Sequence, residues 1–227
     1  MNINFQKELD KKIEQFTIEG VVPKLLLHSC CAPCSSYVLE YLSEYFEITI
    51  FYYNPNINPE AEYDRRVIEQ RRLIDELNQG SDTRVAVKHK IKYEIGNYEP
   101  ERFFALAKGH EEENEGGERC SKCYELRLEE AAIIAKDGGY DYFTTTLSIS
   151  PHKDAAKLNE IGQALEEKYQ VKYLTSDFKK KNGYKRSVEL SKEHQLYRQD
   201  YCGCVYSKRE MLEREEQKAT AIDNNIE

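Results

Sequence analysis

The chain contains seven cysteines, and they fall into three tight clusters in the sequence. The clusters are Cys30, Cys31 and Cys34 in HSCCAPCSS, Cys120 and Cys123 in ERCSKC, and Cys202 and Cys204 in DYCGC. Clusters this far apart in sequence meet only where the fold brings loop ends together. Several thiolates in one place form a metal–sulfur site or a redox site. We therefore expect metal or redox chemistry from this chain.

Two of the clusters share the C-x-x-C spacing, which metal sites and redox sites both use. Cys31 and Cys34 stand at the start of an expected helix, where the helix dipole favours a thiolate. Cys120 and Cys123 repeat the spacing near another helix start, and two such pairs supply four sulfurs, enough for zinc or an iron–sulfur cluster. The long separation of the pairs argues against a small zinc finger. The adjacent Cys30 is expected to point elsewhere, so that the contiguous pair serves either two neighbouring metal centres or a cluster and an open thiolate.

Cys202 and Cys204 form a C-x-C motif around a glycine. A disulfide across so short a loop departs from relaxed geometry and is readily reduced, which suits electron transfer by thiol–disulfide exchange. The alternative is a tight turn that buries two small side chains.

The length of 227 residues fits one large domain with a single core. The formal net charge of -8 disfavours a general nucleic-acid coat, because phosphate binding relies on Lys and Arg. No apolar run approaches the length of a membrane span, and the N-terminus lacks a basic region followed by an apolar stretch. We expect a cytoplasmic protein without a membrane partner, where grouped cysteines bind metal or do redox chemistry more often than they form disulfides.

The apolar pattern predicts strands that alternate with helices, which is typical of an α/β fold with a parallel sheet covered on both faces. The expected strands are residues 24–29, 47–53, 84–87, 142–146 and 171–174. The expected helices are residues 4–19, a helix capped by Ser35 or Ser36, and residues 60–78, 100–108, 124–135, 154–169, 187–193 and 205–215. We divide the chain into an N-terminal helical extension (1–23), a single α/β catalytic domain with a helical C-terminal part (24–215) and a polar tail (216–227).

Ligands collect at the carboxyl ends of parallel strands, so the first cysteine cluster and the segment TTTLSISPHK can share one crevice. His28 and His152 favour a hydrogen-bonded structural role over metal ligation. The hydroxyls of residues 144–146, Ser148 and Ser150 fit either a phosphate or ribose contact or ordinary strand-end packing. The acidic run 111–118 is expected to form a mobile loop.

One basic segment with flanking aromatic rings is the best nucleic-acid patch, although a solvated loop explains it nearly as well. Its cations are Lys179, Lys180, Lys181, Lys185 and Arg186.

Five segments in order give the chain its strongest signal: HSCCAPCSS, FYYNPNINPEAEYDRR, RCSKCYELRLEEAA, FTTTLSISPHKD and DFKKKNGYKRSVELSKEHQLYRQDYCGC. With them the chain resembles the epoxyqueuosine reductase QueH family from about residue 24 to residue 209. The resemblance implies a Rossmann-like fold, similar to the adenine nucleotide alpha hydrolases, without a Gly-rich phosphate loop. It also implies reduction of epoxyqueuosine to queuosine in tRNA, the last step of queuosine biosynthesis.

The resemblance implies a 4Fe-4S cluster with a possible adjacent mononuclear iron. The thiols that it points to as ligands of the cluster or the iron are Cys30, Cys31, Cys120 and Cys123. Cys34, where some relatives carry Asp, is a further metal ligand or a catalytic thiol. Cys202 and Cys204 are expected to relay two electrons, with Tyr201 or Asp200 as a nearby acid.

The implied partners are a tRNA, recognised through its unstacked anticodon loop, and an unidentified electron donor. Arg119, Lys122 and Arg127 are expected to contact the tRNA backbone together with the basic segment. Three other functions remain open: an iron–sulfur-dependent tRNA sulfur transferase that would need ATP, a non-catalytic zinc-stabilised RNA-binding module, and a thiol–disulfide oxidoreductase.

Overall fold

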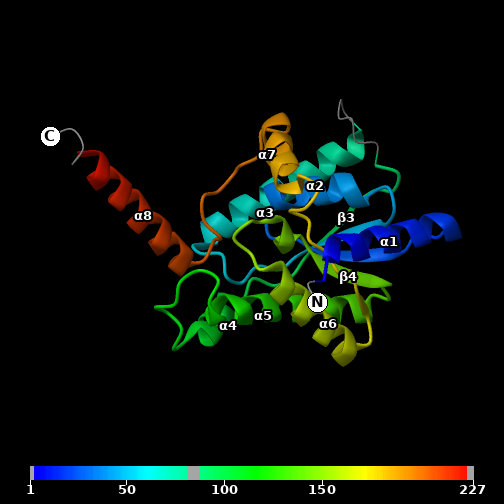
Figure 1. Ribbon diagram of the computed structural model, residues 1–227, viewed down its shortest axis with the longest axis horizontal. Helices are drawn as coiled ribbons and strands as arrows, with labels where there is room; N and C mark the ends of the chain where they lie inside the picture. Colours follow the sequence, from blue (N-terminus) through cyan, green and yellow to red (C-terminus); the bar gives the residue numbers. More distant parts are fainter. Residues whose placement is uncertain (1–2, 81–86, 224–227) are drawn as a thin grey trace.

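The computed structural model describes residues 3–80 and 87–223, and it contains a five-stranded parallel sheet between two layers of helices (Figure 1). The strand order is β3-β2-β1-β4-β5, and each neighbouring pair is parallel. The strands are β1 (Lys24–His28), β2 (Glu47–Tyr52), β3 (Lys92–Ile95), β4 (Tyr142–Thr145) and β5 (Lys172–Tyr173). The predicted α/β fold is confirmed.

The helices follow the predicted alternation with the strands. They are α1 (Phe5–Glu19), α2 (Ala32–Leu42), α3 (Glu60–Gln79), α4 (Pro100–Ala107), α5 (Glu118–Asp137), α6 (Ala155–Tyr169), α7 (Gly183–Glu193) and α8 (Val205–Asp223), with the 3-10 turn η1 (Thr146–Ile149) after β4. Local capping fixes several ends. Asn4 accepts a hydrogen bond from the first turn of α1, and Asp154 accepts two from the first turn of α6.

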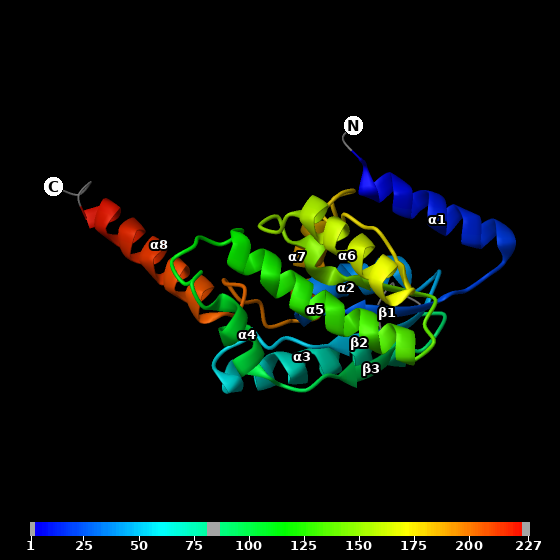
Figure 2. The ribbon, with the colours of Figure 1, turned by 90° about the horizontal axis from the view of Figure 1, so that it is seen from below.

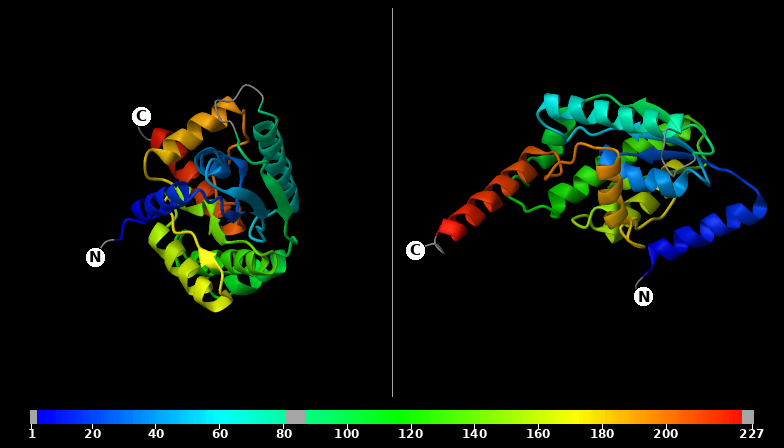
Figure 3. Two further views of the ribbon diagram at one scale, coloured as in Figure 1. Left: turned by 90° about the vertical axis from the view of Figure 1, so that its right-hand side faces the viewer. Right: turned by 90° about the horizontal axis from the view of Figure 1, so that it is seen from above.

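The two faces of the sheet bury two separate cores, and β1 contributes to both because its side chains alternate. Leu25 and Leu27 pack with apolar residues of α1, α2 and α3, whereas Leu26 packs with those of α5 and α6. Figure 3, left, shows these two helical layers above and below the sheet. None of the helices in the described ranges combines the length and the apolar character that crossing a membrane requires.

The carboxyl ends of β1 and β4 lie side by side, and this juxtaposition creates the site. In the parallel register His28 pairs with Thr145, so the chain leaves both strands at the same edge. The next residues touch at once, because the backbone N–H of Cys30 donates to Thr146 Oγ1 over 3.4 Å.

Helix α2 begins earlier than predicted, and its N-cap is Cys31 rather than Ser35 or Ser36. The two serine hydroxyls donate back to the carbonyls of Ala32 and Pro33, so they cannot cap the helix. The earlier start places the second thiol of the cluster at the N-terminus of the helix.

The third strand lies later than predicted. Residues 84–86 of the expected strand lie outside the described residues, and Val87 belongs to no strand. The observed edge strand is Lys92–Ile95, which pairs with β2. It escaped the sequence analysis because its sequence, KYEI, is short, half charged and only partly buried.

Helix α8 continues to Asp223, past the expected end at residue 215, and projects from one end of the body (Figures 1 and 2). At the other end of the chain, Leu9 and Phe16 of α1 belong to the core beneath β1. The proposed boundary at residue 215 therefore falls inside a helix, and the N-terminal extension packs on the domain. The three-part division itself stays a prediction.

Gly162→Ala tests the packing of α6 on β5. Alanine normally stabilises a helix by about 1 kcal/mol relative to glycine. Here the added Cβ would lie 2.4 Å from the ring of Tyr173, which is buried against Phe143. We expect Gly162→Ala to lower the free energy of unfolding by about 1–3 kcal/mol in urea denaturation. The control Gln163→Ala, at an exposed position of the same helix, should change the free energy of unfolding by less than about 0.5 kcal/mol. A Gly162→Ala variant more stable than the wild type would contradict the prediction and show that the ring of Tyr173 moves aside.

Candidate metal and redox centre

The first cysteine cluster forms a compact group of three sulfurs. Cys30 follows β1, Cys31 occupies the N-cap position of α2, and Cys34 lies in the first turn of that helix. The Sγ atoms of Cys30 and Cys31 are 3.8 Å apart, those of Cys31 and Cys34 are 3.0 Å apart, and all three lie within 4.8 Å of one another. The expectation that Cys30 points elsewhere is wrong. The chain turns into α2 between the neighbours and brings both sulfurs to one point.

Three thiols this close cannot ionise independently. Hydrogen bonds from Cys31 and Cys34 hold the pKa of the Cys30 thiol well below its usual range. The hydrogen bond to Cys30 raises the pKa of Cys31 to about 12, and hydrogen bonds to Cys30 and Cys31 raise the pKa of Cys34 well above its usual range. A cation is needed before all three become thiolates, so the group has the donor chemistry of a metal site.

The other four cysteines line a second pocket, with about 340 Å³ of empty space. They are Cys120, Cys123, Cys202 and Cys204. Cys120 and Cys123 lie in the first two turns of α5, which begins at Glu118 rather than at the expected residue 124. All seven cysteines are free thiols.

The C-x-C loop is fixed against the start of α3. The Asn58 N–H donates to Gly203 O over 2.9 Å, and Arg66 Nη1 donates to Cys202 O over 3.0 Å. Gly203 has a φ of 126°, and a Cβ there would lie 2.9 Å from Arg66 and from Ile57. Glycine is therefore required between the two cysteines.

Three buried cations, in addition to Arg119 of the four-cysteine pocket, lie around the sulfurs. Arg127, 1 % exposed, donates to Asn54 Oδ1 over 2.6 Å and reaches Cys123 Sγ at 4.0 Å. Its charge also lowers the pKa of Cys30, after the larger effect of the hydrogen bonds within the thiol group. Within the described residues Arg127 has no carboxylate partner. A buried charge without one is costly, so thiolates or an anionic metal–sulfur group are its natural counter-charge.

The other two cations pair with carboxylates and still face the sulfurs. Arg66 Nε donates to Glu62 over 2.7 Å, and its charge favours the thiolate of Cys31. Lys153 Nζ lies 2.5 Å from Glu115, and both residues line the four-cysteine pocket.

A larger pocket, with about 1110 Å³ of empty space, opens over the three-thiol group. Glu115, Lys153 and Cys202 line both pockets, so the two sulfur groups adjoin. Tyr184 and Arg198 also line the larger pocket. The predicted crevice shared by the first cysteine cluster and the segment after β4 is confirmed.

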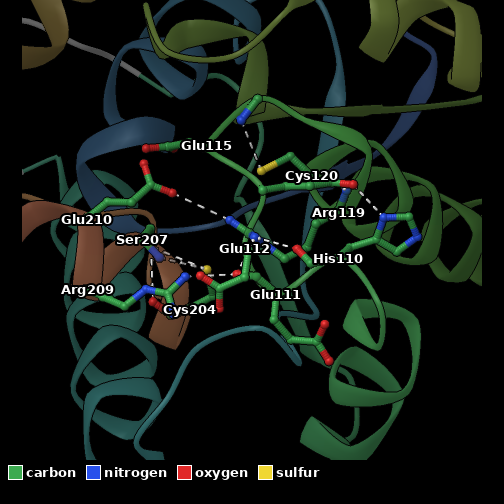
Figure 4. A network of polar contacts seen from close by, with 12 residues as sticks. His110, Glu111, Glu112, Glu115, Arg119, Cys120, Cys204, Ser207, Arg209 and Glu210 are labelled. Atoms are coloured by element: carbon green, nitrogen blue, oxygen red, sulfur yellow. Dashed lines mark hydrogen bonds and ion pairs between the residues drawn. The ribbon is translucent and has the colours of Figure 1, made fainter.

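The acidic run 111–118 is tied down rather than free, contrary to expectation (Figure 4). Arg119 donates to the carbonyls of His110 and Glu111, and it pairs with Glu210 of α8 at 3.5 Å. Arg209 of α8 pairs with Glu112 at 3.1 Å. Two of its acidic side chains are held by cations, Glu112 by Arg209 of α8 and Glu115 by Lys153 after β4.

Three of the five cations of the predicted nucleic-acid patch form ion pairs with carboxylates. Lys179 donates to Asp177, Lys181 pairs with Asp10, and Arg186 pairs with carboxylates of α2 and α7. Lys180 and Lys185 are exposed.

Two of the three cations expected to contact tRNA beside the second cluster are buried. Arg119 and Arg127 are 2 % and 1 % exposed, so neither reaches a phosphate backbone. Their donors are turned inward to carbonyls, an amide and a sulfur. Lys122 is half-buried, and its Nζ lies 2.7 Å from His110 Nε2.

The structural role predicted for His28 is confirmed, because its ring nitrogens lie 2.8 Å from Thr145 Oγ1 and 3.1 Å from Tyr53 O. His152 is exposed at the rim of the larger pocket. The hydroxyls of residues 144–146 and 148 are buried in internal hydrogen bonds, which favours packing over phosphate binding. Lys153 was missed, since a single lysine after a strand gives no sequence signal.

Comparison with known proteins places the chain beside one family. The profile described as "Epoxyqueuosine reductase QueH" matches residues 25–210. Relatives named Epoxyqueuosine reductase QueH include one from Staphylococcus epidermidis, 46% identical over 90% of this chain and 84% of the relative. One from Streptococcus pyogenes is 41% identical over 90% and 78%. One from Thermotoga maritima is 36% identical over 86% and 94%.

The three-thiol group should bind one metal ion by itself. In a variant with serine at the four cysteines of the second pocket, anaerobic Co²⁺ titration should reach one ion per chain, with thiolate-to-metal charge-transfer bands. Adding Cys34→Ser should weaken that binding at least about tenfold. Circular dichroism checks that both variants fold, and a folded four-serine variant without these bands would refute the site.

Proposed function

Because the chain belongs to the epoxyqueuosine reductase QueH family, we propose that it removes the epoxide oxygen of epoxyqueuosine in tRNA and leaves queuosine. The family profile covers both sulfur groups and the segments that carry them. The observation that carries the proposal is the meeting of all seven thiols at one edge of the sheet, beneath a pocket large enough for a nucleobase.

The cysteines fit a metal–sulfur cofactor, because they lie in two adjoining groups flanked by buried cations. Cys30, Cys31, Cys120 and Cys123 would hold a 4Fe-4S cluster, and Cys34 would hold an adjacent mononuclear iron. Support comes from Arg127, whose guanidinium acts on both Cys30 and Cys123. When bound, such a group supplies single electrons and a Lewis-acidic metal.

Cys202 and Cys204 serve as the electron relay. Oxidation of two thiols to a disulfide releases two electrons and two protons, which is the number that removal of an epoxide oxygen as water consumes. Cys202 lines both pockets, and Cys204 lines the smaller one. An external donor, which would reduce the pair again, completes the cycle.

The tRNA enters through its anticodon loop, with the modified base in the larger pocket. A base taken out of its stack is bound by aromatic rings and polar edges, and Tyr184 and Tyr201 line this pocket. Tyr184 lies in the first turn of α7, beside the exposed Lys185. With Lys180, this leaves two exposed cations of the basic patch for phosphate contact.

The activity is tested directly with protein purified anaerobically and incubated with epoxyqueuosine-containing tRNA and dithionite. We expect mass spectrometry of the nucleosides to show loss of one oxygen from the modified base, in proportion to bound iron. An iron-loaded protein that leaves the tRNA unchanged would favour the sulfur transferase instead. A protein that binds only zinc would favour the RNA-binding module.

The roles of the cysteines separate in single variants. Cys120→Ser and Cys123→Ser should lose the visible absorbance of the cluster and the activity together. Cys202→Ser should keep the absorbance and lose turnover by about 100-fold or more, because the relay is broken while the ligands remain. If Cys202→Ser also loses the absorbance, the four cysteines of the smaller pocket hold the cluster instead.

A further inference from the structure

Lys153 is the one buried lysine among the described residues, with 6 % of its surface exposed. Lysine is among the residues least often buried, because removing its charge from water is costly. Its backbone is held from both sides, since its N–H donates to Ser150 O and its carbonyl accepts from Lys179 Nζ. The side chain is thereby directed inward between the sulfur groups.

The ammonium of Lys153 lies where the two pockets meet. Lys153 lines the four-cysteine pocket and the larger pocket over the three thiols, as do Glu115 and Cys202. Its Nζ is 2.5 Å from Glu115 and 5.9 Å from the centre of the Tyr124 ring.

We propose that Lys153 donates a proton to the oxygen that leaves the substrate, an inference that rests on the function proposed above. In the reaction both C–O bonds of the epoxide break and a C=C bond forms. Two electrons from the reductant and two protons convert the oxygen to water. Lys153 supplies one proton and regains it from solvent through Glu115, and the second comes from solvent.

Lys153 suits this role better than the other acids beside the C-x-C motif. Asp200 is exposed, and the ring of Tyr201 lies 5.4 Å from the guanidinium of Arg66. Both residues line the larger pocket and neither lines the four-cysteine pocket. Burial opposes the charge of Lys153, yet Cys202, Tyr124 and Glu115 raise its pKa well above the usual range. The side chain therefore stays an ammonium, which remains a stronger acid than an alcohol whose alkoxide forms as the ring opens.

Lys153→Ala tests the proposal in the metal-loaded protein. We expect turnover of epoxyqueuosine tRNA to fall about 100-fold or more, the usual contribution of a general acid, with bound iron and tRNA affinity unchanged. Added ethylammonium, which enters the open pocket and carries a transferable proton, should restore part of the rate. Tetramethylammonium, which has the charge without an N–H, should not. Lys157→Ala, at an exposed ion pair on α6, is the matched control and should keep wild-type turnover.

The results of this experiment distinguish a failure of the proposed reductase function from a failure of the proposed role of Lys153. Wild-type protein that leaves the tRNA unchanged would defeat the proposed function itself. Wild-type activity with an equally active Lys153→Ala variant, or equal rescue by both cations, would overturn the proton donor alone. Loss of bound iron in Lys153→Ala would also overturn it, in favour of a structural charge. If the alanine variant fails to fold, Lys153→Met, which keeps the length of the side chain, takes its place in the same assay.

Discussion

Sulfur atoms packed together can carry negative charge only where positive charge is brought among them. The protein meets this requirement with two arginines, Arg66 of α3 and Arg127 of α5. Both are buried; the charge of Arg66 favours the thiolate of Cys31, and that of Arg127 favours those of Cys30 and Cys123. The helices that supply them come from both faces of the sheet, so the charge balance of the site requires the whole fold to be assembled.

The sequence predicted the architecture well, because β1, β2 and β4 are apolar runs bounded by clear helix signals. The ordered motifs also predicted the family, which the comparisons confirm over residues 25–210. The crevice at the ends of β1 and β4 was predicted from the general rule that ligands bind at the carboxyl ends of parallel strands. These features depend on patterns within a few residues, which a sequence displays directly.

Features that depend on contacts between distant segments could not be predicted. Arg119 and Arg127 look like surface cations of an amphipathic helix, yet both are buried. The acceptor of Arg127 is the distant Asn54, and Arg119 pairs with the distant Glu210 of α8. The acidic loop looks solvated because its partners, among them Arg209, stand far along the chain. The position of Cys30 depended on one backbone turn that no pattern marks. Only the folded structure shows which cation pairs with which carboxylate or carbonyl.

The distance along the chain between the parts of the site has a consequence for its biosynthesis. Arg66 and the Cys202 carbonyl that it binds are 136 residues apart. At about 5–20 residues per second, a ribosome needs on the order of 10 s to make that stretch. During this interval the three thiols after β1 are already synthesised, while the loop that helps to enclose them does not yet exist. Protection of the nascent thiols from oxidants and from the wrong metal therefore falls to the cell rather than to the fold.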